Sequence, residues 1–540
     1  MNPETTTVAD VVGATLARLG ADHVFGVVGS GNFHVTNALV RHGARFVATR
    51  HEGGAATAAD AYARLTGRPG VVTVHQGCGL TNAMTGIAEA AKSRTPMVVL
   101  AAEPAASALR SNFRVDQDAL AEAVGASSER VHGAATAVTD TVRAWRRAVA
   151  ERRTVVLNLP LDVQAAEAEL TDPPPAPEVE PPRASDEAVR ALADLLTTAR
   201  RPVFIAGRGA LHAKDELERL AARCGALLAT SAVAKGLFAG HAANLDVSGG
   251  FATPLAAELI SSADVVVAWG ASLNMWTSRH GRLIGPDATV VQVDVDPTAI
   301  GAHRHVDLGI VGDARTSAAA VAAAIPGEKT AKLEGATRWR DVPYEDDGDA
   351  GHIDPRTLSI ALDDMLPAER VIAVDSGNFM GYPSMFLSVP DHRGFCFTQA
   401  FQSIGLGLAT ALGAAVARPD RLPVAACGDG GFLMGIAELD TIRRLGIGML
   451  IVVYNDEAYG AEVHHFGPGG HDLSTVVFPE TDLAAVARGH GCAAVTVRSA
   501  IDLDPVRDWL AGPRDVPLVI DAKVAPGKPS WWLEEAFRGH

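Results

Sequence analysis

A carboxylate and a carboxamide, Asp429 and Asn455, each follow directly after a short apolar run. Carboxylate and amide oxygens are hard ligands that suit Mg²⁺, which completes its shell with water and substrate phosphates. Asp429 lies in the turn Gly428-Asp429-Gly430-Gly431, where glycines let backbone N–H groups approach a phosphate closely. These residue types predict a magnesium–diphosphate site.

The two residues meet only if the chain between them folds as strand, helix and parallel strand. Pro423–Cys427 and Met449–Tyr454 are apolar on both faces, as strands of a covered parallel sheet are. Parallel strands bring their carboxyl ends to one edge, so we expect Asp429 beside Asn455. A Gly-Asp-Gly turn alone also fits an ordinary turn after a buried strand. Between the strands, apolar residues three or four apart predict one helix: Phe432, Ile436, Leu439, Ile442 and Leu445.

A further carboxylate, Glu52, stands where strand Ala44–Ala48 gives way to helix Ala55–Thr66. Taken alone, it fits a carboxylate that complements a helix dipole, an effect worth ~0.3–1 kcal/mol. It belongs to the phrase RHEGGAATAADAYARLTGRPG, and the strand Gly70–His75 after it leads into QGCGLTN.

The whole chain alternates short apolar strands with Ala/Leu-rich helices, which predicts an α/β fold with parallel sheets. Two segments read as linkers: the Pro-rich, acidic Thr171–Ser185 and the polar, charged Pro326–Gly351. They divide the 540 residues into three doubly wound domains, at 1–170, 186–325 and 352–530.

Composition narrows the function classes. A net charge of −16 argues against a surface for nucleic acid or anionic membrane. Five scattered cysteines without a CxxC pair argue against zinc or a disulfide framework and for a reducing compartment. The N-terminus, MNPETTTVADVV, shows no secretory signal, and no apolar run is long enough for a membrane span. We expect a cytoplasmic enzyme.

The stretch Gly428–Asn455 resembles the diphosphate-binding motif of thiamine-diphosphate (ThDP) enzymes, although Asp456 stands where that family has a second Asn. The phrase around Glu52 resembles the family's pyrimidine-domain motif, and GCGLTNAMTGIAEA resembles its next motif, with Cys78 in place of Pro. The resemblance implies that Glu52 is the glutamate that activates the cofactor's aminopyrimidine ring. It makes Asp429, Asn455 and the backbone carbonyl of Glu457 the Mg²⁺ ligands. The implied cofactor-binding residues are Glu52, Ser376, Gly377, Asn378, Ile404, Gly428, Gly430, Gly431 and Tyr459.

The order pyrimidine domain, central domain and diphosphate domain matches the acetolactate synthase, benzoylformate decarboxylase and pyruvate decarboxylase group. This implies a homodimer or homotetramer in which Glu52 of one subunit meets the cofactor of another. The central domain of such enzymes holds FAD in some members and nothing in others. The turn GRGA at 207–210 is weak evidence for a nucleotide, and Ser248–Ala256 departs from the GMHG phrase of flavin-bearing members, so no FAD is expected.

Three polar residues bear on the reaction. Ser30 and His75 match the active-site serine and histidine of benzoylformate decarboxylases, and Glu462 matches the catalytic glutamate of pyruvate decarboxylases. Without the resemblance, His75 fits a strand-end histidine bonded to a carbonyl, and Glu462 an exposed helix carboxylate. These three polar groups favour proton transfer and hence a decarboxylase, whereas the phrases RHEGGAA and GCGLTN look most like those of acetolactate-synthase-type proteins. We expect an enzyme that decarboxylates a 2-oxo acid and transfers or releases the resulting aldehyde unit. The alternatives are release of free aldehyde, a flavin-dependent oxidase, or a catalytically silent partner subunit.

Overall fold

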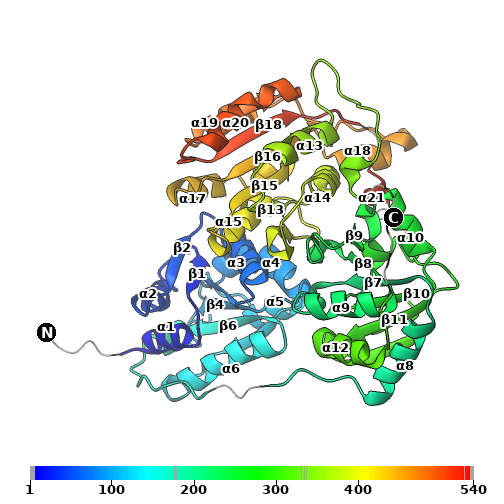
Figure 1. The fold of residues 1–540 in the computed structure, drawn as a ribbon. Coiled ribbons are helices and arrows are strands. Elements are labelled where there is room, and N and C mark those ends of the chain that lie inside the picture. Colours follow the sequence, from blue (N-terminus) through cyan, green and yellow to red (C-terminus); the bar gives the residue numbers. More distant parts are fainter. Residues whose placement is uncertain are drawn as a thin grey trace.

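A computed structural model describes residues 6–175, 179–329, 331, 333, 335, 337–527 and 530–534. Within these residues the chain forms three six-stranded sheets, all parallel, with helices packed against them (Figure 1). This confirms the predicted α/β class with three doubly wound sheets. Residues 1–5, which the targeting prediction used, lie outside the described residues, as do 176–178, 330, 332, 334 and 336 of the linkers and 528–529 of the third predicted domain.

The first sheet, blue to cyan in Figure 1, has the strand order β2-β1-β3-β4-β6-β5. Its strands are β1 (His23–Gly26), β2 (Arg45–Ala48), β3 (Gly70–Val74), β4 (Met97–Glu103), β5 (Ser127–Arg130) and β6 (Thr154–Pro160). Its helices are α1 (Val8–Arg18), α2 (Phe33–Arg41), α3 (Glu52–Thr66), α4 (Cys78–Lys92), α5 (Gln117–Ala123), α6 (Ala137–Ala150) and α7 (Leu161–Gln164).

The second sheet, green in Figure 1, has the order β12-β11-β10-β7-β8-β9. Its strands are β7 (Pro202–Ala206), β8 (Leu227–Thr230), β9 (Asn244–Val247), β10 (Val265–Trp269), β11 (Thr289–Asp294) and β12 (Leu308–Val311). Its helices are α8 (Asp186–Thr198), α9 (Lys214–Cys224), α10 (Pro254–Ser261), α11 (Met275–Ser278) and α12 (Ala314–Ala324).

The third sheet, yellow to red, has the order β14-β13-β15-β16-β18-β17. Its strands are β13 (Arg370–Val374), β14 (Phe395–Phe397), β15 (Leu422–Gly428), β16 (Leu450–Asn455), β17 (Ala493–Val497) and β18 (Leu518–Lys523). Its helices are α13 (Pro355–Met365), α14 (Gly381–Phe386), α15 (Gly407–Ala417), α16 (Asp429–Met434), α17 (Glu438–Arg444), α18 (Gly460–Phe466), α19 (Leu483–Gly489), α20 (Asp504–Ala511) and α21 (Trp531–Glu534).

Each sheet reverses its direction of winding between two interior strands, which are β1 and β3 in the first sheet, β7 and β10 in the second, and β13 and β15 in the third. The first and third sheets reverse again at their last strands, because β6 lies between β4 and β5, and β18 lies between β16 and β17. Open parallel sheets bind ligands at the carboxyl ends of the strands beside such a point. The polar turns at Ser30, His75, Ser376 and Asp429 follow strands beside such a point, while Glu52 follows β2 and Asn455 follows β16, each one strand further along its sheet.

The helix predicted between the two strands of the diphosphate motif is broken in two. α16 ends at Met434 and α17 begins at Glu438. Gly435 is the C-cap residue that follows α16. A Cβ at this position would lie 2.9 Å from the Gly405 carbonyl oxygen, so the neighbouring loop leaves too little space for a side chain. Of the predicted apolar face, Phe432, Leu439 and Ile442 are fully buried, whereas Leu445 is 40% exposed. The break makes Glu438 the first residue of a new helix.

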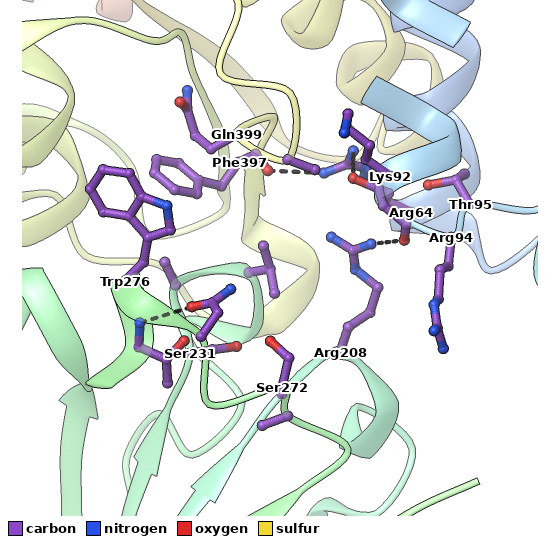
Figure 2. A pocket seen from close by; sticks show the side chains of 18 of the residues that line it. Arg64, Lys92, Arg94, Thr95, Arg208, Ser231, Ser272, Trp276, Phe397 and Gln399 are labelled. Atoms are coloured by element: carbon purple, nitrogen blue, oxygen red, sulfur yellow. Dashed lines mark hydrogen bonds between the residues drawn. The ribbon is translucent and has the colours of Figure 1, made fainter. Parts of the chain in front are cut away.

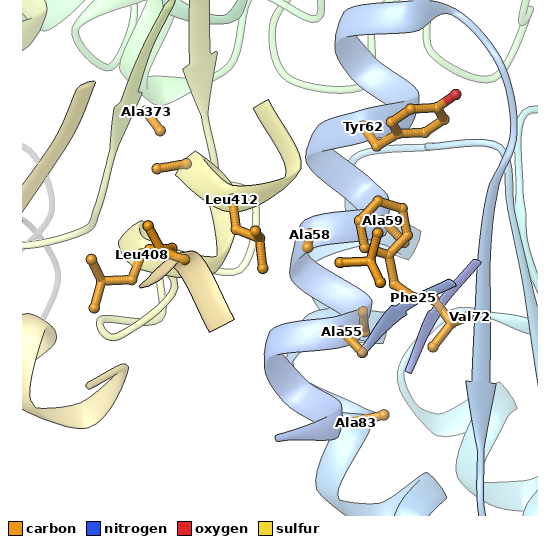
Figure 3. Packing of buried hydrophobic residues seen from close by; sticks show 14 of the residues in the cluster. Phe25, Ala55, Ala58, Ala59, Tyr62, Val72, Ala83, Ala373, Leu408 and Leu412 are labelled. Carbon is orange, nitrogen blue, oxygen red and sulfur yellow. The ribbon is translucent and has the colours of Figure 1, made fainter. Parts of the chain in front are cut away.

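Helix α3 of the first sheet packs directly against α15 of the third (Figure 3). Ala58 of α3 lies on the side that faces Leu412 of α15, whereas Ala55 lies on the side of Phe25 and Val72 of the first sheet. The backbones come so close that a Cβ on Gly413 would lie 2.1 Å from the Ala58 carbonyl oxygen. Small side chains at this contact explain the Ala/Gly-rich sequences of both helices.

None of the helices in the described part of the chain is long and apolar enough to cross a membrane. The five cysteines are all free thiols, and four of them are buried. Cys78, at the start of α4, is exposed.

Candidate active site

Asp429 and Asn455 lie at the carboxyl ends of β15 and β16, which are neighbouring parallel strands. The Asn455 side chain is buried and oriented by two hydrogen bonds. Its Nδ2 donates to Asp521 Oδ1 at 2.8 Å, and its Oδ1 accepts the Glu457 N–H at 3.1 Å. The amide oxygen is thereby turned along the edge of the sheet where Asp429 stands.

Glu457, the third predicted metal ligand, has a left-handed backbone with φ of +55°. Its carbonyl oxygen accepts the Phe478 N–H at 2.8 Å. Because a carbonyl oxygen has two lone pairs, one remains for a cation.

Buried carboxyl groups and the buried Lys523 ammonium lie at this edge, and Lys523 Nζ is 3.4 Å from Glu457 Oε1. Burial raises the pKa of Asp429 to about 6. Burial, and then the charge of Asp429, raise the pKa of Asp456 to about 7. Close carboxylates repel one another when ionised, and a divalent cation removes that repulsion. The oxygen donors and the charge fit Mg²⁺. Among the described residues no group of three His, Cys, Asp or Glu is placed to hold a metal, so a cation here depends on the amide and carbonyl oxygens as well as Asp429.

The glycines of the turn after β15 are needed for space. A Cβ on Gly430 would lie 2.6 Å from the Tyr459 ring, and a Cβ on Gly431 would lie 2.4 Å from Asp375 Oδ2. Backbone N–H groups in such a turn stay open to a phosphate because no side chain covers them. This cradle fits the diphosphate of the predicted cofactor.

The turn after β13 contains Ser376, Gly377 and Asn378, which the resemblance assigned to cofactor binding. Gly377 has φ of +137°, a conformation that favours glycine. The Asn378 Oδ1 accepts a hydrogen bond from Ser530 Oγ at 2.6 Å. The chain near its C-terminal end therefore packs on this turn.

The loop that carries Ile404 is held by hydrogen bonds to a buried carboxylate, Asp375, just after β13. Asp375 is fully buried, and its oxygens accept the N–H groups of Gly405 at 3.0 Å and Leu406 at 3.1 Å. Burial raises the pKa of Asp375 to about 6, while these N–H groups act in the opposite direction. Asp375 orients the loop, and Ile404 lines the cavity beside it.

A carboxylate of the first sheet's helices holds the other end of that loop. Glu89 of α4 accepts the N–H groups of Ala400 at 3.1 Å and Phe401 at 2.7 Å. It also pairs with Arg64 of α3 at 2.8 Å, and that arginine in turn pairs with Asp60 at 2.6 Å. Both carboxylates are fully buried. The Ile404 loop is thus positioned from two parts of the fold.

Tyr459 and Glu462 come from the segment after the predicted metal ligands. Tyr459 precedes α18 and packs its ring edge-on against Phe478, with centroids 4.9 Å apart. Glu462 lies in the first turn of α18, is half-buried, and lines the same cavity as Asp429. The expectation of a fully exposed helix carboxylate is not met.

Glu52, Ser30 and His75 gather at the carboxyl ends of β1 to β3. Glu52 is the first residue of α3, and its Oε2 accepts a hydrogen bond from Asn82 Nδ2 at 3.0 Å. His75 Nδ1 lies 3.0 Å from the Gln76 carbonyl oxygen, and Nε2 lies 3.4 Å from Ser30 Oγ. If Nδ1 donates to that carbonyl, Nε2 is an acceptor that faces the serine hydroxyl.

One large cavity, of about 2550 Å³, runs past the diphosphate edge and on between the first and second sheets. From the predicted site it is lined by Ser376, Gly377, Asn378, Ile404, Gly428, Asp429, Gly430, Gly431, Tyr459 and Glu462. Glu52, Ser30 and His75 are not among its lining residues in the described part of the chain, and neither are Asn455 and Glu457, the other two predicted metal ligands. We call the predicted residues at the diphosphate edge and those around Glu52 the two half-sites.

The GRGA turn has a packing role in the second sheet. A Cβ on Gly207 would lie 2.3 Å from the Gly270 carbonyl oxygen, so the turns after β7 and β10 touch through their backbones. The Arg208 side chain points towards Arg64 (Figure 2) and donates to the Ser93 carbonyl oxygen. Contacts between parts of the protein explain these residues, and the absence of FAD stays a prediction.

Comparison with protein families matches all three parts of the chain. Residues 6–125 match the N-terminal TPP-binding domain of thiamine pyrophosphate enzymes, 189–321 their central domain, and 375–522 their C-terminal TPP-binding domain. Thiamine pyrophosphate is another name for ThDP. The chain belongs to the family of thiamine pyrophosphate enzymes, which confirms the resemblance seen in the sequence.

Curated relatives match over most of their length. A probable 2-ketoarginine decarboxylase of Pseudomonas aeruginosa is 32% identical over 95% of this chain and 93% of its own. A sulfoacetaldehyde acetyltransferase of Alcaligenes xylosoxydans xylosoxydans is 30% identical over 83% and 81%, and an acetolactate synthase large subunit of Parasynechococcus marenigrum is 29% identical over 97% and 89%. The chain is therefore a ThDP-dependent enzyme related to decarboxylases, synthases and acetyltransferases.

Sequence reasoning missed the residues that orient the predicted ones: Asp375, Glu89, Asn82 and Glu438. Asp375 ends an apolar strand, and Asn82 lies in the recognised LTN phrase, so each carried a signal. Glu89 and Glu438 lie within amphipathic helices, where a carboxylate reads as a solvent-exposed residue.

Proposed function

We propose that this chain is a ThDP- and Mg²⁺-dependent enzyme that decarboxylates a 2-oxo acid and transfers the remaining aldehyde unit to a carbonyl acceptor. The observation that carries the proposal is the pair of complementary half-sites. One half offers the oxygens of Asp429, Asn455 and Glu457 among buried carboxyl groups. The other offers Glu52, held by Asn82 at 3.0 Å.

Bound ThDP supplies a carbon nucleophile for the 2-oxo acid and accepts the electrons left behind when CO₂ departs. In the proposal, Asp429, Asn455 and the Glu457 carbonyl hold the cation, and the glycine turn after β15 holds the diphosphate. Glu52 shares a proton with the cofactor's pyrimidine ring, and Asn82 orients its carboxylate.

Assembly of the complete site requires a second copy of the chain in this proposal. Glu52 is not among the residues that line the cavity beside Asp429, which is compatible with a site completed by Glu52 of a second subunit. Exposed apolar side chains flank both halves. Phe113 packs on the His75 ring and is 43% exposed, and Met434 of α16 is 61% exposed. Apolar surface of this kind marks protein interfaces. A homodimer, or a homotetramer built from two such dimers, buries it.

Release of a free aldehyde is the second candidate. His75 and Ser30 lie 3.4 Å apart beside the Glu52 half-site, and Glu462 lines the other half. These groups suit proton transfer to a departing product, because imidazole and carboxyl side chains act as general acids and bases. The names of the three relatives span decarboxylation, acetolactate synthesis and acetyl transfer, so they favour no single acceptor.

The test is CO₂ release from a panel of 2-oxo acids with ThDP and Mg²⁺, with and without aldehyde acceptors, and products identified by mass spectrometry. A condensed hydroxyketone or acetolactate supports transfer, and a free aldehyde supports release. Bound ThDP without CO₂ from any acid would favour a silent subunit, and flavin absorbance in the purified protein would favour an oxidase.

The Glu52→Gln variant should lose about 10²–10⁴-fold in kcat, the usual contribution of a positioned acid or base. Glu187→Gln is the matched control, because Glu187 is also a first-turn glutamate but is exposed on α8. Full activity of Glu52→Gln would refute the proposed role of Glu52.

A further inference from the structure

The start of α3 is held by a carboxylate from a distant part of the chain. Glu438, the first residue of α17, is 2% exposed. Its Oε1 accepts the His51 N–H at 3.0 Å, and its two oxygens lie 3.2 and 3.3 Å from the Arg50 nitrogen. Thr441 donates to Oε2 at 2.6 Å and so orients the carboxylate. Arg50 and His51, whose N–H groups Glu438 accepts, are the two residues that directly precede Glu52.

Arg50 and His51 lie just before α3, where His51 is the N-cap residue and its Nδ1 accepts the Gly53 N–H at 3.0 Å. The backbone N–H groups of Arg50 and His51 need partners of their own, because a buried N–H without one is costly. A carboxylate is the strongest acceptor for such groups because the bond is charge-assisted. Burial raises the pKa of Glu438, and the bonds from Thr441, Arg50 and His51 act in the opposite direction. Those bonds offset part of the free-energy cost of burying the ionised carboxylate.

The second glycine after Glu52 makes room for this contact. A Cβ on Gly54 would lie 2.4 Å from Glu438 Oε1 and 2.9 Å from its carboxyl carbon. Alanine is ordinarily the better helix former, so glycine here has a steric reason. The rest of α3 is held along its side by α15 (Figure 3). The diphosphate-binding part of the chain thus holds α3 at its start and along its length.

We propose that Glu438 is a positioning residue that sets the place of Glu52 by accepting the N–H groups of Arg50 and His51. It acts through the backbone at the start of α3 and does not touch the cofactor. The inference rests on the proposed function of Glu52. The inference also explains why glycine stands at position 54, because Gly54 leaves room for the Glu438 carboxylate. The cofactor chemistry proposed for Glu52 gives no reason for a glycine there.

The first measurement is amide hydrogen exchange in the cofactor-free protein, read by mass spectrometry on peptides that cover residues 48–56. Glu438→Gln replaces one acceptor oxygen with a donor group, so exchange there should quicken by ~10-fold or more. Gly54→Ala should also quicken exchange there, because the new Cβ would push the Glu438 carboxylate away from the two N–H groups. The higher helix propensity of alanine would by itself slow exchange. The matched control is Asp440→Asn, on the same helix, because Asp440 contacts the side chains of Arg50 and Arg444 in exposed ion pairs and does not bond the backbone before Glu52.

The second measurement separates positioning from general stability. In the parent, Glu438→Gln should lower kcat by ~10-fold or more with little change in KM for the donor acid. In the Glu52→Gln background the same substitution should cost nothing further, because residues that act as one unit are not additive. A further loss in the double variant would overturn the inference. If Glu438→Gln does not fold, Glu438→Asp and Gly54→Ala test the inference instead. Both are measured by amide hydrogen exchange and by kcat in the parent and Glu52→Gln backgrounds.

The two proposals fail in different ways. Full activity of Glu52→Gln removes the role of Glu52, and the inference with it. An inactive Glu52→Gln, together with Glu438→Gln and Gly54→Ala that match the parent in exchange and turnover, removes the inference alone.

Discussion

The contact between α3 and α15 allows a sharp test with a single methyl group. In Gly413→Ala the new Cβ would lie 2.1 Å from the Ala58 carbonyl oxygen and 2.8 Å from its Cα. These are backbone atoms, so no rotamer change removes the clash, and the helices must separate by roughly 1 Å to reach ordinary contact. Overpacking of this kind lowers the free energy of unfolding by ~1–3 kcal/mol. We expect the upper part of this range, because backbone atoms cannot move aside as a side chain can.

Alanine regains up to ~1 kcal/mol as the better helix former. The net expectation is a loss of ~1–2 kcal/mol, equivalent to an apparent Tm lower by about 2–8 °C for a unit of this size. Separation of the helices also moves Glu52 relative to the Ile404 loop, which leads into α15. We therefore expect kcat to fall along with the apparent Tm.

The assay is thermal unfolding followed by fluorescence at one scan rate, because a three-part chain need not unfold in two states. Gly489→Ala is the matched control. Gly489 is the last residue of α19, and a Cβ there meets nothing within 4 Å. An apparent Tm for Gly413→Ala at or above that of the control would refute the close backbone contact.

Three other substitutions test the site and its supports. Arg64→Met leaves Asp60 and Glu89 buried without their partner and should destabilise by about 3–5 kcal/mol in chemical denaturation; an unchanged midpoint would contradict the network. Burial raises the pKa of Asp375 from 3.8 to about 6, so the folded chain binds that proton more tightly than the unfolded one. The free energy of unfolding should therefore fall as pH rises from about 4 to about 6, and Asp375→Asn, which cannot ionise, should lose that part of the slope; equal slopes would argue against it. Asp429→Ala should abolish Mg²⁺-dependent binding of ThDP, measured by quenching of tryptophan fluorescence, and unchanged binding would remove Asp429 from the metal site.

Much of the site could be read from the sequence because parallel sheets obey a local rule. A polar residue directly after an apolar strand lies at the carboxyl edge, and the strand order then decides its neighbours. Asp429, Asn455 and Glu52 were placed in this way, and the three sheets and the family are confirmed. The one clear error of local structure is the helix broken at Gly435. There a close approach of the Gly405 loop overrides the apolar period.

By itself, the sequence determined the strands, the polar turns after them and the family, since all of these depend on residues close together in the chain. Only the tertiary structure decided that Glu89 holds the Ile404 loop and that Glu438 holds the residues before Glu52. The physical reason is that a buried carboxylate on a helix has the same local pattern as an exposed one. Its partners are backbone N–H groups hundreds of residues away, and those have no side-chain signature.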